Sequence, residues 1–321
     1  MKAIQVTKYG GPEVLEMIDL EVPEPALGQV RVEIRAAGVN FIDTYHRTGL
    51  YPLDLPFIPG QEAAGFVHAV GDGVSNLKVG DRVAYASTQG SYAQYRVIPA
   101  SKLVKIPAHF SFELAAAVML QGMTAHYLVH DTARLERGDT VLAHAAAGGV
   151  GLLLVQMAKM KGAMVIGTAG SEEKIERAFA AGADHMIQYT EKDFLHEVLE
   201  LTDGTGVDVV YDSVGQSTFA KSLECLRTRG TLVSFGQSSG PVPPFDPRSL
   251  AKKSLYLTRP KLGDYTQDRN ELLGRANDLI SWIDDRKLDV RIDSTYPLEN
   301  AADAHRRIES RESSGKILVC P

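Results

Sequence analysis

The order of apolar and polar residues divides the chain into a region rich in strands and a region in which strands and helices alternate. In QVRVEIRAAGVN, the apolar residues Val30, Val32 and Ile34 alternate with charged residues, and this period of two predicts a half-buried strand. GFVHAVGDGV and VGDRVAYA are further short apolar runs that contain the turn pairs Asp-Gly and Gly-Asp. The first third of the chain is therefore predicted to be mainly β structure.

From residue 139 to residue 259 the period of the apolar pattern changes repeatedly. Short runs with strand composition are followed by turn residues and then by helical patterns, which predicts a parallel sheet with helices on both faces, an α/β fold. The apolar runs are TVLAHA, AMVIGTA, HMIQY, VDVVYD and GTLVSFG, and the helical segments end at Lys161 or span 172–181, 194–201 and 219–226.

Three patterns complete the chain. SLYLTR, residues 254–259, predicts a last strand of the parallel sheet. DRNELLGRANDLISWIDDRKL is helical, with Trp282 on its apolar side, and GKILVCP predicts a short strand at the end.

Length and composition indicate a soluble two-domain enzyme. A chain of 321 residues exceeds the size of one ordinary core. Its net charge of -6 disfavours nonspecific nucleic-acid binding, which needs a basic face. The two cysteines, Cys225 and Cys320, are far apart, which favours a reducing compartment over a disulfide framework. Because we find neither a signal-peptide pattern nor an apolar run of membrane length, we expect a cytoplasmic protein.

The strongest motif is AAGGVG, which lies between a predicted strand and a predicted helix. Against the pattern G-x-G-x-x-G, Ala146 replaces the first glycine, and Gly148 and Gly151 fill the second and third places. The second glycine lets the backbone approach a pyrophosphate, and the third lets the helix pack on the strand. The helix N-terminus adds N–H groups and a positive dipole end. The motif therefore predicts a dinucleotide site.

The next βα turn indicates which dinucleotide binds. An NAD site places a carboxylate at the end of this strand, but the chain has Ala169 and Gly170 there. Ser171 is expected to cap the following helix, whereas the cation of Lys174 opposes the helix dipole. A bound 2′-phosphate would explain that lysine, and a solvated surface lysine is the alternative.

The carboxyl ends of later strands carry small polar sequences. YDSVG, residues 211–215, and SFGQSSG, residues 234–240, stand where a parallel sheet of this kind forms its cofactor cleft. Both allow backbone to approach a ligand, and the alternative is that they are ordinary turns.

With these motifs, the chain resembles the zinc-independent quinone oxidoreductases of the medium-chain dehydrogenase/reductase superfamily, the group that includes zeta-crystallin. The resemblance covers nearly the whole chain. VNFIDTY, GLYP and AAAGGVG carry it most specifically, and PGQEAAGFV, LQGMTAHYL, VYDSVG and LTRPKL follow in family order.

The resemblance implies a GroES-like β catalytic domain, residues 1–123 and 264–321, interrupted by a Rossmann domain, residues 124–263. It implies NADPH as the cofactor. It places substrate-positioning residues at Asn40, Tyr45 and Tyr51, and cofactor-binding residues at Asn40, Thr124, Gly148, Gly149, Val150, Gly151, Ser171, Lys174, Tyr189, Phe235 and Ser238. It also implies a homodimer formed through the edge strand at 254–259.

A metal is not expected. Zinc members of the superfamily have a cysteine where this chain has Val39 and Asn40, and Gly-His-Glu where it has Gly60, Gln61 and Glu62. The cysteines of a structural zinc lobe are also missing, and zinc needs several nitrogen or sulfur ligands together. His126 and His130 share a helix face without an evident third ligand.

Without a Lewis acid, alcohol oxidation loses its activator, whereas a quinone carbonyl is already electron-poor. The favoured function is NADPH-dependent reduction of a small-molecule quinone by hydride transfer, with the protein positioning the nicotinamide and excluding water. One alternative is a reductase of activated alkenes such as enals or enones. Another is a nucleotide-binding structural or RNA-binding protein. The physiological acceptor and the electron count stay open.

Overall fold

The computed structural model describes residues 1–321, which divide into two compact units. The first unit comprises Met1–Met123, Thr266–Ile280 and Val290–Pro321, and the second comprises Thr124–Tyr265 and Ser281–Asp289. Two of the four divisions fall inside helices, one inside α2, Phe112–Tyr127, and one inside α8, Arg269–Asp284. The expected domain ranges, residues 1–123 with 264–321 and residues 124–263, stay a prediction.

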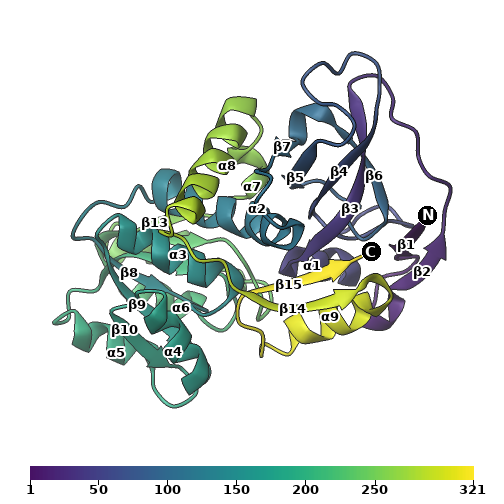
Figure 1. The fold of residues 1–321 in the computed structure, drawn as a ribbon. Helices are drawn as coiled ribbons and strands as arrows, with labels where there is room; N and C mark the ends of the chain where they lie inside the picture. Colours follow the sequence, from purple (N-terminus) through teal and green to yellow (C-terminus); the bar gives the residue numbers. More distant parts are fainter. The chain divides into compact units, whose positions relative to one another are not determined.

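The first unit is built on a seven-stranded sheet with the order β14-β15-β3-β4-β5-β7, and β6 also pairs with β3 (Figure 1). Only β14 and β15 are parallel; the other pairs are antiparallel. Two short strands form a separate antiparallel pair. The bounds are β1 Lys2–Gln5, β2 Glu16–Asp19, β3 Gln29–Val39, β4 Glu62–Val70, β5 Arg82–Ala86, β6 Tyr95–Pro99, β7 Val104–Lys105, β14 Ile292–Pro297 and β15 Lys316–Cys320.

The long strand β3 confirms the predicted alternation and qualifies it at one residue. Val30, Val32 and Ile34 lie in the core of the unit. Arg31, on the polar side of the pattern, is nevertheless buried, because its guanidinium forms an ion pair with Glu24 at 2.7 Å and donates to His68 Nδ1 at 3.3 Å. A polar side chain can be buried when its hydrogen bonds are satisfied, and the alternation of apolar and polar residues does not predict this.

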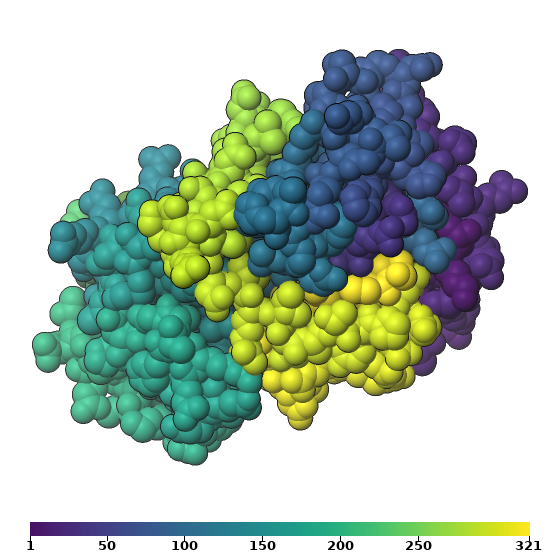
Figure 2. All heavy atoms as spheres, viewed as in Figure 1, coloured from purple at the N-terminus to yellow at the C-terminus, as the bar shows by residue number.

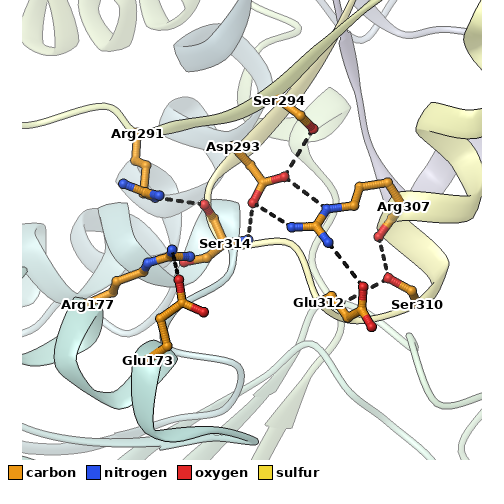
Figure 3. Close-up of polar contacts among 9 residues, drawn as sticks. All are labelled: Glu173, Arg177, Arg291, Asp293, Ser294, Arg307, Ser310, Glu312 and Ser314. Atoms are coloured by element: carbon orange, nitrogen blue, oxygen red, sulfur yellow. Dashed lines mark hydrogen bonds and ion pairs between the residues drawn. The ribbon is translucent and has the colours of Figure 1, made fainter.

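The C-terminal segment returns to the first unit and lies beside residues from the beginning of the chain, as the yellow and purple atoms in Figure 2 show. Strand β15 pairs antiparallel with β3. Asp293 on β14 holds this return in place (Figure 3), since it accepts from Arg307 Nε at 3.2 Å and from the N–H of Ser314 at 2.8 Å. Arg307 belongs to helix α9, Ala301–Glu309, and Ser314 lies just before β15.

The second unit contains a six-stranded, wholly parallel sheet with the order β10-β9-β8-β11-β12-β13. Its first strand, β8, lies in the middle, and the chain builds outward to β10 on one side and to β13 on the other. This is the doubly wound order of dinucleotide-binding folds, so the predicted parallel sheet is confirmed. The bounds are β8 Thr140–Ala143, β9 Met164–Ala169, β10 His185–Gln188, β11 Val207–Asp212, β12 Leu226–Ser234 and β13 Tyr256–Thr258.

The helices of the chain agree with the sequence patterns, with two differences. The helix expected to end at residue 226 ends at Glu224, because Leu226 already begins the buried strand β12. Helix α2 continues as a π-helical turn, Leu128–Thr132. The other helices are α1 Phe41–Thr48, α3 Gly149–Met160, α4 Glu172–Ala180, α5 Phe194–Leu201, α6 Phe219–Glu224 and α7 Leu262–Tyr265, and 3-10 turns span Pro12–Val14, Ala100–Lys102, Pro247–Lys252 and Leu298–Asn300.

None of these helices combines the length and the apolar character that a membrane crossing requires.

Candidate functional site

The glycine turn joins β8 to α3 and leaves the start of the helix open for a ligand. Gly148 is the N-cap of α3 and has an extended backbone. The N–H groups of the next three residues, Gly149, Val150 and Gly151, have no intrahelical acceptor, and the chain supplies no other backbone acceptor for them. Three N–H donors at a helix N-terminus form a ready site for a phosphate.

Gly151 is required by the close approach of helix and loop. A Cβ atom at this position would lie 2.2 Å from the carbonyl oxygen of Ala145 and 2.7 Å from that of Ala146. Ala145 itself has a φ of 52°, which tightens the turn. Gly148 is less constrained, since its Cβ would meet only the oxygen of Ala145, at 3.2 Å. The third glycine of the motif therefore allows close packing, but against the turn after β8, whereas the sequence predicted packing against the strand.

The second βα turn, after β9, brings a tyrosine hydroxyl to the place where the acidic residue of an NAD site would stand. A Cβ atom on Gly170 would lie 2.7 Å from the hydroxyl oxygen of Tyr189, so this side chain lies directly against the turn. The ring is half exposed. Its backbone N–H donates to the carbonyl of Ala169 at 3.1 Å, which fixes the residue beside the end of β9.

Ser171 and Lys174 lie at the start of α4, as the sequence predicted, but the serine is not a side-chain cap. Ser171 is the N-cap by its backbone, and its hydroxyl makes no capping hydrogen bond. The expected cap position is therefore confirmed, and only the capping hydrogen bond from the hydroxyl to a first-turn N–H is absent. Lys174 is the third residue of the helix, beside the ion pair of Glu173 and Arg177 drawn in Figure 3.

A buried carboxylate that the sequence reading missed organises the turn after β11. Asp212 Oδ1 accepts from the N–H groups of Val214 and Gly215, at 2.8 and 3.0 Å. The Thr218 hydroxyl donates to the same carboxylate at 2.8 Å. The YDSVG turn is thus shaped by its aspartate as well as by its glycine. The signal in the sequence that could have identified Asp212 was its position at the carboxyl end of a buried strand.

Asp212 continues into a chain of hydrogen bonds that links three strand ends. Ser222 Oγ donates its one hydrogen to Asp212 Oδ2 at 3.3 Å. It must therefore accept in its contact with His144 Nε2, at 3.0 Å. His144 Nδ1 then accepts from the Thr168 hydroxyl at 3.1 Å. Burial lowers the pKa of His144, so the ring is neutral, with its proton on Nε2. We call His144, Thr168, Asp212 and Ser222 the Asp212 cluster; it fixes the ends of β8, β9 and β11.

The loop after β12 carries Phe235 and Ser238 and is held against the YDSVG turn. The N–H of Phe235 donates to the carbonyl of Asp212 at 2.9 Å, and the N–H of Ser238 donates to that of Ser213 at 3.1 Å. Arg259 braces the same loop from beyond β13, with a bond to the Ser234 carbonyl at 3.1 Å. Thr124, the remaining predicted cofactor residue of this unit, is buried on α2.

In the first unit, the amide of Asn40 is held on all sides. Its Oδ1 accepts from Lys316 Nζ at 2.9 Å and from Gln121 Nε2 at 3.3 Å. Its Nδ2 donates to Glu62 Oε1 at 2.8 Å and to the carbonyl of Gly38 at 3.3 Å. These four bonds use the ordinary capacity of an amide, so a ligand that bonded to this side chain would have to displace one of them.

Strand register explains why these residues meet. Ile317 lies opposite Val39 across β15 and β3, so Lys316 is adjacent to Asn40. Ala63 lies opposite Ala37 across β4 and β3, so Glu62 faces Gly38. Lys316 and Glu62 are at most 1% exposed and form a direct ion pair. Burial lowers the pKa of the lysine well below its usual value, and the charge of Asp43 opposes that shift.

Asp43 adds a second buried carboxylate. Its Oδ2 accepts from the N–H of Asn40 at 2.9 Å, which closes a capping box at the start of α1. Its Oδ1 is buried and has no hydrogen-bond partner. Burial raises the pKa of Asp43 to about 7. We call Asn40, Asp43, Glu62 and Lys316 the Asn40 cluster.

A further buried chain fixes Asp43 from the other side. Arg47 can only donate, so His305 Nδ1 accepts from it at 3.0 Å and His305 Nε2 carries the proton. This proton points to the Tyr92 hydroxyl at 3.1 Å, and Tyr92 donates to Asp43 Oδ2 at 3.4 Å. Burial lowers the pKa of His305 to about 3, so the imidazole stays neutral.

Tyr45 and Tyr51 form an aromatic pair at the end of α1. Their ring centroids are 5.3 Å apart in an edge-on arrangement. The helix ends at Gly49, which has a φ of 78°, and the chain turns back so that the N–H of Tyr51 donates to the carbonyl of Tyr45 at 3.0 Å. The structure thus brings together two of the predicted substrate-positioning residues, with a glycine turn as the cause.

Two positions that the sequence analysis compared with zinc ligands, Asn40 and Gln61, are occupied by hydrogen-bonded amides. Gln61 Nε2 donates to Gln89 Oε1 at 3.1 Å and lies 3.4 Å from His46 Nδ1. One group elsewhere has three possible ligand atoms close together, His196, Glu197 and Glu200 on the surface of α5. Glu197 there already pairs with Lys192.

Two family profiles match the chain. One, described as an alcohol dehydrogenase GroES-like domain, covers residues 26–108. The other, described as a zinc-binding dehydrogenase, covers residues 149–278.

Individual relatives match over nearly the full length. The chain is 47% identical to a quinone oxidoreductase of Pseudomonas aeruginosa, over 100% of this chain and 99% of the relative. It is 42% identical to a 2-haloacrylate reductase of a Burkholderia species, over 99% of this chain and 98% of the relative. A solved structure of the Escherichia coli quinone oxidoreductase complexed with NADPH shares 45% identity, and the match covers 100% of both chains with a TM-score of 0.98.

Proposed function

The chain belongs to the quinone oxidoreductase family of the medium-chain dehydrogenase/reductase superfamily, and we propose that it reduces quinones with NADPH by hydride transfer, without zinc. One observation carries the proposal: the likeness to the NADPH-complexed quinone oxidoreductase of Escherichia coli extends over the whole chain, at 45% identity. A doubly wound parallel sheet with an open glycine turn is the structural counterpart of that likeness.

In the second unit, the residues present fit NADPH. The N–H groups of Gly149, Val150 and Gly151 would bind the pyrophosphate. Ser171, Lys174 and Tyr189 would hold the 2′-phosphate, because the turn beside them has a tyrosine hydroxyl and no carboxylate. We assign Thr124, Phe235 and Ser238 to the nicotinamide half. The bound cofactor supplies the hydride, and the chain supplies orientation and exclusion of water.

In the first unit, Asn40, Tyr45 and Tyr51 are proposed to border the acceptor. The aromatic pair offers a surface on which a quinone ring stacks. Asn40 borders the nicotinamide and acceptor through a side chain that Lys316 and Glu62 hold in one orientation. Such fixed orientation favours catalysis because less freedom is lost when the reactants meet.

Reduction of activated alkenes is the second candidate. The 42% identity with a 2-haloacrylate reductase favours it, since that name describes an alkene conjugated to a carboxyl group. Both candidates need the same hydride donor and differ in the acceptor.

The decisive experiment measures NADPH oxidation by the purified enzyme with 1,4-benzoquinone and, separately, with an enone and a 2-haloacrylate. We expect the quinone to give the higher kcat/KM. Turnover of the alkenes alone would replace the first candidate by the second. Binding of nucleotide or RNA without turnover of any acceptor would contradict both.

Cofactor choice has its own test. Lys174→Ala should weaken NADPH binding by about one to two orders of magnitude, which corresponds to loss of one hydrogen bond to a charged group. NADH binding should be nearly unchanged. Lys287→Ala, on an exposed lysine of the same unit that pairs with Asp285, is the matched control. Equal losses for both cofactors in the Lys174 variant would assign that residue to the fold instead.

The enzyme is further proposed to be a cytoplasmic homodimer. β13 is the last strand of the parallel sheet, and Tyr256 on it is 62% exposed. Pairing with the same strand of a second copy would cover this edge. Sedimentation at micromolar concentration should give twice the chain mass of 34.9 kDa.

Because the proposed reaction needs no zinc, the purified enzyme should keep full activity after treatment with a strong chelator.

A further inference from the structure

A histidine outside the predicted site residues, His46, lies among the residues proposed to border the acceptor. It is on α1, between Tyr45 and the glycine turn that leads to Tyr51. Its ring centroid is 6.5 Å from that of Tyr51, whose ring in turn packs against Tyr45. The imidazole therefore belongs to the same group of side chains as the aromatic pair.

Three hydrogen bonds in sequence fix which ring nitrogen of His46 carries the proton. The carbonyl of Ile58 can only accept, so the Gln89 atom at 2.6 Å from it is the amide nitrogen. Gln89 Oε1 therefore faces Gln61, and the Gln61 atom at 3.1 Å from it must be Nε2. The second hydrogen of that nitrogen points to His46 Nδ1 at 3.4 Å, which must accept.

The other nitrogen of the ring is consequently a donor without a partner in the chain. A neutral imidazole that accepts at Nδ1 carries its hydrogen on Nε2. Nε2 of His46 makes no hydrogen bond within the chain, and it is not among the polar atoms shut off from solvent. His46 as a whole is only 6% exposed, so a nearly buried side chain presents this one N–H to the outside.

The electrostatics of the residue suit a neutral donor. Burial lowers the pKa of His46, so the ring is uncharged at neutral pH. A neutral N–H in a largely buried place stabilises negative charge that develops on an oxygen, as donors of an oxyanion hole do. A residue with a packing role alone needs the contact at Nδ1 and has no use for an accessible N–H.

We propose that His46 is a catalytic residue, which donates a hydrogen bond from Nε2 to the carbonyl oxygen of the acceptor as the hydride arrives. This role rests on the proposed function. NADPH gives up a hydride and becomes NADP⁺; the acceptor takes the hydride, an electron pair moves onto the carbonyl oxygen, and a solvent proton completes the hydroquinone. His46 keeps its proton and is not oxidised.

Three substitutions separate the two ring nitrogens. His46→Gln places an amide nitrogen near the position of Nε2, His46→Asn places one near Nδ1, and His46→Phe keeps the ring shape without a donor. We expect kcat with 1,4-benzoquinone to fall at least about 10-fold in the Asn and Phe variants, because one donor to a developing oxyanion is lost. The Gln variant should retain most of kcat, and the Kd for NADPH should be unchanged in all three.

The control is His196→Asn, on an exposed histidine of α5, which should keep wild-type kinetics. Thermal unfolding of each variant separates lost chemistry from lost fold. Unchanged kcat in the Asn and Phe variants, or equal losses in all three, would overturn the role of His46 while leaving the proposed function standing. A wild-type enzyme without turnover of quinones or enones would overturn both.

A spectroscopic readout tests the same assignment without turnover. Long-range ¹H–¹⁵N correlation spectra distinguish the two neutral tautomers of histidine, and the His46 signals are those that vanish in His46→Asn. We expect the Nε2–H tautomer at neutral pH. In Gln61→Leu, which removes the donor to Nδ1, the Nδ1–H form should gain population. A wild-type His46 that carries its proton on Nδ1 would refute the proposal.

Discussion

The two units each contain a buried polar cluster, and the clusters handle charge in opposite ways. In the Asp212 cluster, a single carboxylate accepts hydrogen bonds at both oxygens, from Val214, Gly215, Thr218 and Ser222. In the Asn40 cluster, two carboxylates share the interior with one ammonium, and Asp43 Oδ1 has no partner. In the Asp212 cluster, both carboxylate oxygens have hydrogen-bond donors. In the Asn40 cluster, one carboxylate oxygen has none, and the net charge of the cluster depends on how many protons its acidic and basic groups hold.

The difference reflects where the partners come from. All four groups that donate to the carboxylate of Asp212 lie within ten residues of it in the sequence, so the neighbouring segment supplies them. Lys316 reaches Asn40 across 276 residues and Glu62 across 254. The Asp212 cluster, on the proposed cofactor side, is thus built from local backbone geometry, and the Asn40 cluster, on the proposed acceptor side, depends on the return of the C-terminal strand. Substitution and pH should therefore disturb the acceptor side more.

The largest effect is expected from Lys316→Met. This change removes the ammonium and leaves Glu62 charged and buried, with only the Asn40 amide and the N–H of Leu120 as partners. Breaking a buried ion pair on one side costs roughly 3–5 kcal/mol. Urea unfolding should show a loss of that size in the free energy of unfolding.

The matched variant is Lys316→Met combined with Glu62→Gln. It removes both charges, so it should be more stable than the single variant even though it carries one more substitution. A single variant within about 1 kcal/mol of the wild type would show that the pair contributes no more than an exposed one.

The second effect is the dependence of stability on pH caused by Asp43. Its pKa is about 7 in the folded chain and 3.8 without the fold, so the folded state binds this proton more tightly. The stability that the folded state gains by binding this proton at Asp43 is fully present below about pH 4 and is lost as the pH rises through about 7. At 1.36 kcal/mol per pKa unit, it amounts to at most about 4 kcal/mol.

Asp43→Asn keeps an oxygen that can accept the capping bond and removes the titration. The free energy of unfolding of this variant should therefore change less between pH 4 and pH 7 than that of the wild type. Parallel curves for the two proteins would place the titrating group elsewhere.

The third effect is local to the cofactor side. Asp212→Asn replaces one accepting oxygen by an NH₂ group, which can no longer accept from the turn. We expect a loss of about 1–3 kcal/mol in stability and weaker NADPH binding, measured by calorimetry, since the YDSVG turn loses part of its support. Ser239→Ala removes two neutral bonds, in which the hydroxyl accepts from the N–H of Ser217 and donates to the carbonyl of Val214, and it should cost less because neither partner is charged. The reverse order would mean that Asp212 is not the organiser of these turns.

The sequence was sufficient for features that local pattern determines. The AAGGVG turn, the strand alternation in β3 and the parallel sheet of the second unit follow from glycine spacing and apolar period, whereas the Rossmann domain came from the resemblance. The aromatic pair came from the resemblance, and the structure adds the Gly49 turn that brings Tyr45 and Tyr51 together.

Other features depend on pairing between distant segments, which a pattern does not encode. Lys316 is the first residue of a short terminal strand, a place where a lysine is ordinarily exposed. Only the register of β15 against β3 shows that it lies beside Asn40. Asp43 and His46 belong to no motif that the sequence analysis singled out, and α1 itself was not predicted. Their burial follows from the elements that cover α1, among them α9 with His305.

The smallest effect is expected where charge is exposed. Glu173 and Arg177 form an ion pair at helix spacing on α4, and the glutamate side chain is 71% exposed (Figure 3). Such pairs contribute about 0.3–0.5 kcal/mol, and a carboxylate in the first turn of a helix adds a similar amount through the helix dipole. Glu173→Ala should therefore cost no more than about 1 kcal/mol in urea unfolding, and less at high salt. NADPH should bind equally well or slightly better, because a negative charge near the proposed 2′-phosphate site is removed, while NADH binding stays constant. A loss of more than about 2 kcal/mol would mean that burial does not decide how strongly charges in this chain affect its stability.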